Sequence, residues 1–399
     1  PTQFLRCCSL SAEKPSSLYS RSVRRFLVYS GIYLVQASDL DMTQYSALTD
    51  PLLLGTLTWR EIEDMYACAS LMEPETRRNL GARGLLNIDR IEDCDFERHF
   101  RFKKTDFYHL SSCLMVPNDF VSAQRVTVPG HEALCMALRR LAYPNRLFDL
   151  EVMFNRHQSV ISSVVNMVLA HVEHYFDHLL QDLSTHSWLT VTSLERFCEA
   201  VHAKGAPLKN CWGFIDGTAR KICRPTSEQQ EDFSGHKRCH VQKYQAVMCP
   251  NGIVCQLDGP LRGRRHDAGI LKKTNLYNNL EKVTQGHNFV IYGDPAYPLR
   301  PLLLKPFGGC RLQPHEAWFN KKMSTVRQAV EWGFGKVATE FAFLDFPKNQ
   351  KIGRQNIGRM YRVATLLSNA HTCLYDSQVS QYFNLDPPAL DEYLVPFSG

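Results

Sequence analysis

The sequence of 399 residues lacks the hallmarks of two large protein classes. None of its fourteen cysteines is arranged as Cys-x-x-Cys, and their spacings are irregular. Disulfide frameworks are typical of short secreted chains, so we expect reduced thiols in a nuclear or cytosolic protein. The early apolar run Phe26–Val35 is too short to cross a bilayer. We therefore expect neither a disulfide scaffold nor a membrane protein.

The chain also has little excess of charge of one sign, since its net charge is only +6. That charge is unevenly placed, because residues 216–275 contain eleven Lys or Arg against six Asp or Glu, a net +5. Such a basic stretch suits a polyanionic substrate, although a solvated basic surface gives the same count. With 44% apolar and 22% charged residues, the composition is that of an ordinary globular protein.

Periodicity divides the chain into four regions. Residues 1–55 are rich in Ser and lack sustained periodicity, which predicts a poorly ordered leader. Residues 56–185 show helical patterns and predict a helical domain. Residues 186–375 alternate between strand and helix patterns, which predicts an α/β catalytic domain, and residues 376–399 are expected to form a C-terminal tail.

Three helices are predicted within residues 131–181. Apolar positions between Ala133 and Leu141 mark an amphipathic helix, and a short helix is expected at 147–154. A longer helix follows, with Ser159 as its expected N-cap. Helices joined by a tight turn suit a DNA-binding helix-turn-helix, but the same spacing occurs in plain helical bundles.

From Asn210 the pattern changes to that of strands. We predict, in order, strands at 211–225, 240–249 and 253–261, a helix at 268–281, a strand at 289–292 and a helix at 320–337. Pro250-Asn251-Gly252 is a hairpin turn between the second and third strands. This order fits a ribonuclease-H-like mixed sheet with helical cover, in which the first and fourth strands are neighbours.

Three acidic residues of this domain lie at the ends of predicted strands or on a predicted helix. Asp216 and Asp294 each follow an apolar, strand-like run, and Glu331 lies on a predicted helix 37 residues after Asp294. Neighbouring first and fourth strands would bring the two aspartates together, and Glu331 would approach from its helix. Such carboxylates bind hard divalent cations, and pairs of these cations suit phosphodiester chemistry. Alternatively, the aspartates begin turns and Glu331 pairs with Arg327.

Two Gly-rich segments between the aspartates are dense in basic residues. Backbone and guanidinium groups of such loops can bind phosphates closely. The predicted phosphate-binding residues are Lys237, Arg238, Arg264 and Arg265. Three further residues are expected to contact the acids and orient them, namely His266, Asp267 and Arg327.

A series of motifs in this half of the chain resembles a known family. In order they are Ile215-Asp216-Gly217-Thr218, Ser234-Gly235-His236-Lys237, Gly263-Arg264-Arg265-His266-Asp267, Gly293-Asp294-Pro295-Ala296-Tyr297-Pro298 and Arg327-x-x-x-Glu331-x-x-Phe334-Gly335. This order resembles the PIF/Harbinger transposases and the harbinger transposase-derived nucleases. The resemblance extends upstream toward Phe96 and covers about 270 residues.

The resemblance implies a ribonuclease-H-like core with an Asp-Asp-Glu triad of Asp216, Asp294 and Glu331. It further implies a nuclear endonuclease that uses two divalent cations, Mg²⁺ or Mn²⁺, and an upstream helix-turn-helix. Asp216 would contact both cations, while Asp294 and Glu331 would each complete one coordination shell. The implied partners are DNA and a Myb-like nuclear protein. A homo-oligomer is a further expectation, but the sequence does not reveal the oligomeric state.

Three functions are therefore weighed. The first is a metal-dependent DNA endonuclease of transposon origin, which all three acids favour. The second is a domesticated protein that binds DNA or a nuclear partner on the same fold without cutting, because a fold does not settle a function. A metal phosphatase is the third, but it leaves the basic loops and the helix-turn-helix without a purpose.

Overall fold

The computed structural model describes residues 85–265, 271 and 274–397, together with the backbone of three short strands nearer the N-terminus. Two compact units are present, Pro1–Glu75 and Thr76–Gly399. In the first, β1 (Arg25–Val28) pairs antiparallel with β2 (Tyr33–Gln36). Apart from these two strands, the expected leader at 1–55 lies outside the described residues. No described helix is both long enough and apolar enough to cross a membrane.

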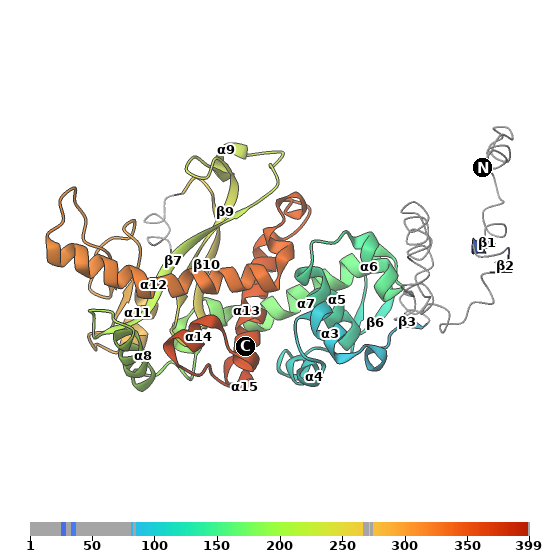
Figure 1. Cartoon of the computed structure of the whole chain (residues 1–399), viewed down its shortest axis with the longest axis horizontal. Helices are drawn as coiled ribbons and strands as arrows, with labels where there is room; N and C mark the ends of the chain where they lie inside the picture. Colours follow the sequence, from blue (N-terminus) through green and yellow to red (C-terminus); the bar gives the residue numbers. More distant parts are fainter. Residues whose placement is uncertain are drawn as a thin grey trace. The chain divides into compact units, whose positions relative to one another are not determined.

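The second unit begins with a helical part, drawn in blue to green in Figure 1. Its elements are β3 (Gly81–Ala82), β4 (Leu85–Leu86), α3 (Asp93–Phe100), α4 (Lys104–Cys113), β5 (Asp119–Val121), β6 (Thr127–Pro129), α5 (Gly130–Ala142), α6 (Leu147–Phe154) and α7 (Gln158–Phe176). Helices α5 and α6 both pack on α7. This packing gives the helix–turn–helix succession at 131–181, while DNA binding by it stays a prediction.

The start of α7 differs from the sequence expectation. The N-cap is His157, whose side chain accepts a hydrogen bond from the backbone N–H of Ser159. One residue earlier, Arg156 makes a double hydrogen bond to the buried carboxylate of Glu132 on α5, at 2.8 and 2.9 Å. Ser159 is therefore not the cap. The ion pair between the two helices places the turn, an effect that periodicity does not reveal.

The rest of the unit is built on a mixed sheet with the strand order β10-β9-β7-β11-β12. Its strands are β7 (Cys211–Lys221), β8 (Phe233–Ser234), β9 (Cys239–Met248), β10 (Val254–Arg262), β11 (Val290–Tyr292) and β12 (Leu303–Leu304). Strands β7, β9 and β10 form an antiparallel meander, and β11 lies parallel to both β7 and β12. The first and fourth main strands are neighbours, as a ribonuclease-H-like sheet requires.

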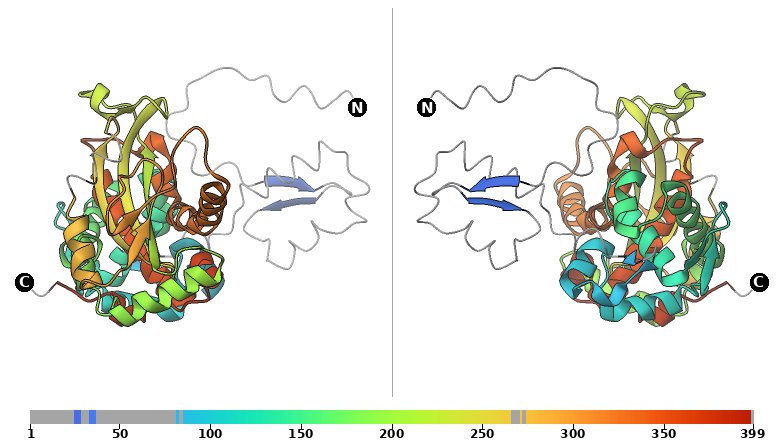
Figure 2. Two further views of the ribbon diagram at one scale, coloured as in Figure 1. Left: turned by 90° about the vertical axis from the view of Figure 1, so that its left-hand side faces the viewer. Right: turned by 90° about the vertical axis from the view of Figure 1, so that its right-hand side faces the viewer.

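Helices lie on both sides of this sheet (Figure 2). They are α8 (Val191–Ala203), α11 (Leu276–Thr284), α12 (Pro314–Glu340), α13 (Ile357–Tyr375), α14 (Gln378–Phe383) and α15 (Leu390–Tyr393), with the single turn α9 (Gln229–Asp232) beyond the sheet. Helices α8 and α12 contact β7, and α13 contacts β10. The short helical turns are η4 (Ile88–Arg90), η5 (Asp177–Leu180), η6 (Leu183–Thr185), η7 (Ala342–Asp345) and η8 (Pro347–Asn349).

Two of the predicted segments differ in the structure, and a third is described only in part. Of the helix expected at 268–281, Leu271 is helical and α11 covers Leu276–Thr284, while residues 266–270, 272 and 273 lie outside the described residues. The helix expected at 320–337 begins at Pro314, where Glu316 accepts a hydrogen bond from the backbone N–H of Gln313 at 2.8 Å. The segment expected to be a tail forms α14 and α15, because Phe383 and Tyr393 are buried.

Candidate active site

Strand register brings two of the three predicted acids together. In the parallel pair of β7 and β11, Tyr292 is the register partner of Phe214. Asp294 and Asp216 each lie two residues further on, so they meet where β11 ends beside the middle of β7. The first five residues of β7 are buried, and Asp216 is the first that is partly exposed. The site therefore opens where the strand leaves the core.

A glycine allows the end of β11 to pack tightly. A Cβ atom on Gly293 would lie 2.7 Å from Cδ2 of Tyr297 and 2.9 Å from Cγ2 of Ile215. Such contacts are too short for any larger residue without a shift of the strand. Asp294 then begins a turn, because its Oδ1 accepts a hydrogen bond from the backbone N–H of Ala296 at 2.9 Å. Asp294 thus combines the turn role weighed above with a place beside Asp216.

The third acid reaches this edge from α12. Arg327 on that helix donates a hydrogen bond from Nη1 to Oδ2 of Asp216 at 2.9 Å, and its Nη2 lies 3.9 Å from Oε1 of Glu331. The arginine therefore does pair with Glu331, but its closer partner is Asp216. The Glu331 side chain is 62% exposed. A guanidinium cation stands between the two carboxylates.

Helix α12 can approach the sheet closely because Gly333 faces β9. A Cβ atom on Gly333 would lie 1.7 Å from Cε of Met248. From the same stretch of helix, the backbone carbonyl of Phe334 accepts a hydrogen bond from Arg220 on β7 at 3.0 Å. These contacts hold the middle of α12 against the sheet two residues after Glu331.

The electrostatic environment of Asp216 sets it apart. Burial raises the pKa of Asp216, Arg327 lowers it, and the nearby negative charge of Asp294 raises it again, with a net upward shift. A carboxyl group in this situation gains from any further cation that approaches it. The site is therefore short of positive charge even with Arg327 in place.

A second half-buried acid lies on the opposite face of the same sheet. Register pairs Asp258 on β10 with Gln245, and Gln245 with Gly217, so Asp258 points away from the face of Asp216. Burial raises the pKa of Asp258 to about 6, and its partners are the side-chain amides of Gln245 and Gln256. Among the described residues, Asp258 forms no ion pair, and sequence patterns did not single it out.

The predicted phosphate-binding residues lie beyond the acids, at the far end of the long strands. Lys221 on β7 is the register partner of Val241, so the antiparallel strands run about 16 Å past Asp216 at ~3.3 Å per residue. We call residues 228–238 and 262–265 the distal basic loops. Lys237 and Arg238 are exposed within them.

Acidic residues of the distal basic loops already pair with several of the arginines. Arg264 lies 3.5 Å from Glu231, and Arg262 lies 3.0 Å from the buried Asp232 and also pairs with Glu228. The structure thus places these basic residues together at one end of the sheet, and two of the five Lys and Arg residues of the loops, Arg262 and Arg264, form ion pairs within them. The predicted supporting residues His266 and Asp267 lie outside the described residues.

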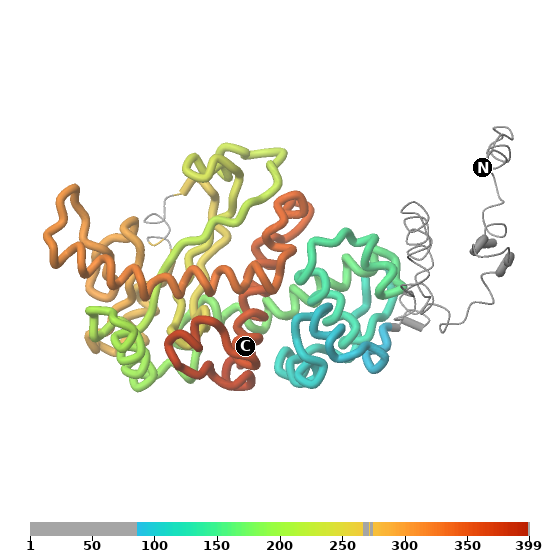
Figure 3. The backbone as a smooth tube through the Cα atoms, viewed as in Figure 1, coloured from blue at the N-terminus to red at the C-terminus, as the bar shows by residue number. Residues whose placement is uncertain are grey.

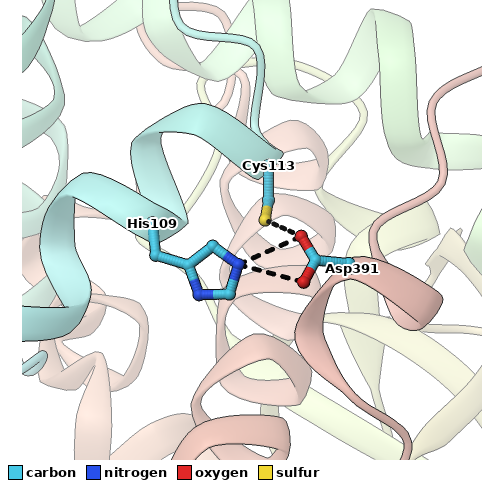
Figure 4. Close-up of side chains that lie close together, drawn as sticks. All are labelled: His109, Cys113 and Asp391. Atoms are coloured by element: carbon cyan, nitrogen blue, oxygen red, sulfur yellow. Dashed lines mark hydrogen bonds and ion pairs between the residues drawn. The ribbon is translucent and has the colours of Figure 1, made fainter.

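One group of three metal-type ligands comes within 4.8 Å among the described residues, and it is not the predicted one. His109 and Cys113 are one turn apart on α4, and both meet Asp391 of α15 (Figure 4). The Asp391 carboxylate lies 3.0 Å from Nε2 of His109 and accepts a hydrogen bond from Sγ of Cys113 at 3.0 Å. Burial and this carboxylate raise the pKa of Cys113 to about 12, so the thiol is protonated. The cluster ties the C-terminal helix to α4.

Comparisons with known proteins agree with this geometry. Residues 215–369 match the family model described as DDE superfamily endonuclease, a span that contains Asp216, Asp294 and Glu331. The chain is 23% identical over 270 residues to the protein called ALP1-like of Arabidopsis thaliana. That alignment covers 63% of this chain and 64% of the relative. No solved structure matches. The comparisons support the DDE endonuclease family for residues 215–369 and, with it, a nuclease-type function.

Proposed function

We propose that the chain is a divalent-metal-dependent DNA endonuclease of transposon origin, related to the PIF/Harbinger transposases. Asp216, Asp294 and Glu331 would be its metal ligands. The observation that carries this proposal is the alignment of Asp216 with Asp294 across β7 and β11, together with the approach of Glu331 on α12. The family match over the same residues adds to it.

The donor set fits hard cations. All three side chains offer carboxylate oxygens, which Mg²⁺ and Mn²⁺ prefer. A cation already lies between two of them, because the guanidinium of Arg327 contacts both Asp216 and Glu331. The raised pKa of Asp216 supports the same reading, since burial next to Asp294 leaves its charge undercompensated. When bound, two divalent cations would activate water or a DNA 3′-hydroxyl and stabilise the departing oxyanion.

The chain's own residues would then divide the remaining work. Arg327 orients Oδ2 of Asp216, and Gly293 keeps Asp294 close to β7. Lys237, Arg238, Arg264 and Arg265 would hold DNA phosphates on the far side of the acids. We propose action in the nucleus, with a Myb-like protein and a second copy of the chain as further partners.

A non-cutting DNA-binding protein on the same fold is the second candidate. The observation that favours it is the ion pair of Arg327 with Asp216, because a salt bridge can satisfy this carboxylate without any metal. The two functions differ in one measurable property. An endonuclease cleaves DNA when Mg²⁺ or Mn²⁺ is supplied, whereas the binding protein does not.

The test is nicking of supercoiled plasmid with Mn²⁺ or with EDTA, using the wild type and Asp216→Asn. We expect Mn²⁺-dependent cutting that falls by roughly 10³-fold or more in the variant, because a ligand is lost while the side-chain shape is kept. DNA affinity should hold or rise, because a negative charge is removed.

Asp258→Asn is the matched control. It removes a half-buried carboxylate from the opposite face of the same sheet, where its hydrogen bonds within the described residues come from the amides of Gln245 and Gln256. This variant should cut like the wild type. Equal cutting by the wild type and Asp216→Asn would show that the activity lies elsewhere, and no cutting by a folded, DNA-binding wild type would favour the second candidate.

A further inference from the structure

A second cationic surface lies at the N-terminal end of α12, the helix that carries Glu331. We call residues 305–322 the arm; it comprises the loop after β12 and the first nine residues of α12. The arm contains four Lys or Arg and one acidic residue, a net +3 in eighteen positions. Figure 3 shows it in orange at the left-hand end of the tube, where the helix and its preceding loop project past the sheet.

The cations of the arm have no local counter-charge. Arg311, Lys321 and Lys322 are exposed, and within the described part of the chain none of them forms an ion pair. The one acid, Glu316, is engaged by the backbone N–H of Gln313 at the start of α12. Because nothing in the arm neutralises these charges, they are available to an anionic partner.

Exposed aromatic rings stand among these cations. The side chains of Phe307 and Trp318 are 46% and 54% exposed. Within the described residues, Trp318 has no hydrogen bond, ring contact or cation–π contact. Lys321 and Lys322 follow Trp318 by three and four positions, so the three side chains lie on one side of the helix.

The arm is held in place rather than loosely attached. Asn320 exchanges two hydrogen bonds of 2.9 Å with the backbone N–H and carbonyl of Phe307. The Phe307 ring packs on Phe319 at 5.2 Å, and Phe319 in turn contacts Tyr292 on β11. These contacts fix the backbone of the helix that carries Trp318, so the exposed ring stays at one place on the surface.

We infer that the arm binds the DNA that flanks the cleaved bond, with Trp318 stacked on an unpaired base and Lys321 and Lys322 on the adjoining phosphates. Aromatic rings set in basic grooves bind unstacked bases in this way. This inference rests on the proposed function, because it extends the DNA path from the acidic site. Trp318 lies thirteen residues before Glu331, roughly 20 Å along the helix axis, which is about six nucleotides of DNA.

Binding can be measured without cleavage. Full-length protein carrying Asp216→Asn is mixed in EDTA with a fluorescent DNA duplex that ends either blunt or in a single-stranded overhang. Trp318→Ala should weaken binding to the overhang DNA about tenfold and change blunt-duplex binding little, because the stacked base is lost. Trp318→Phe should restore most of the affinity. Phe397→Ala, which removes another exposed ring, is the control and should bind normally.

The charge requirement is tested with paired lysines. Lys321→Ala with Lys322→Ala should weaken binding to both the blunt and the overhang DNA. It should also lower the slope of log affinity against log salt by about 2. The control pair, Lys348→Ala with Lys351→Ala, also removes two exposed lysines and should leave the slope unchanged. Wild-type affinity of Trp318→Ala for the overhang, or equal losses on both DNAs, would overturn the stacking inference. Binding to anionic lipid vesicles in place of DNA would overturn it too.

These outcomes are separable from those of the nicking assay. Loss of overhang binding in the arm variants supports the inference even if the wild type never cuts. Conversely, metal-dependent cutting with wild-type overhang binding by Trp318→Ala keeps the proposed endonuclease and removes the arm from it.

Discussion

The distal basic loops and the arm are both rich in Lys and Arg, yet they offer that charge to solvent very differently. In the loops, three acidic residues form ion pairs with Arg262 or Arg264, and the Asp232 partner of Arg262 is buried. In the arm, Arg311, Lys321 and Lys322 project without an ion pair among the described residues, and the exposed Trp318 lies on the same side of α12 as the two lysines. A count of basic residues along the sequence favours the loops. The folded structure favours the arm as the more available cationic surface.

This difference shows that a basic residue can have two physical roles. Arg262 compensates a buried carboxylate and so holds a loop together, which is a structural task. Lys321 compensates nothing within the described protein and can exchange its counterions for phosphates. The following predictions separate these roles, from the largest expected effect to the smallest.

Arg262→Ala should cost the most stability. Removal of the guanidinium leaves Asp232, whose side chain is 1% exposed, without its cation. We expect the free energy of unfolding to fall by about 2–4 kcal/mol, measured by urea denaturation. Arg238→Ala, which removes an exposed arginine of the same loops, should change it little. Equal stability of Arg262→Ala and the wild type would place this arginine among the available cations.

Arg264→Ala with Arg265→Ala should weaken DNA binding less than the lysine pair of the arm. Arg264 already has Glu231 at 3.5 Å, so its loss releases fewer counterions on binding. We expect the salt slope to fall by about 1 or less, against about 2 for Lys321→Ala with Lys322→Ala. A larger fall for the loop variant would reverse the comparison.

Glu231→Gln should release Arg264 from its ion pair and cause the smallest change in DNA affinity. Without the carboxylate, Arg264 has no acidic partner within its loop, and DNA affinity should rise about two- to threefold at low salt. Glu281→Gln, an exposed change on α11, serves as the control. Unchanged affinity would mean that Arg264 does not contact DNA at all.

Much of the catalytic sheet could be predicted from the sequence. Alternating apolar residues and the Pro250-Asn251-Gly252 turn indicated β9 and β10 within one or two residues. The short apolar run before Asp294 indicated β11. Such patterns are local, so they survive without knowledge of tertiary contacts. Whether Asp216, Asp294 and Glu331 act as a triad stays a prediction.

The features that sequence reasoning missed depend on contacts between distant residues. Arg327 was expected near the acids, but its closer pairing with Asp216, 111 positions away, follows from no spacing rule. The arm was missed because its helix was expected to begin at 320, although Pro314 and Glu316 are the usual signals of a helix start. Residues before 320 received no helical prediction, so the alignment of Trp318 with Lys321 on one helix was not expected.

The parallel pairing of β7 with β11 also governs when the site can exist. These strands are neighbours in space, but the meander and α11 separate them along the chain. The antiparallel β7–β9–β10 meander needs only short hairpin closures and can form early, whereas β11 must close a much longer loop. During synthesis, a chain that ends before Val290 carries Asp216 and the distal basic loops but neither Asp294 nor Glu331. The proposed acidic site is therefore completed only after the chain has been synthesised past Glu331 and β11 has paired with β7.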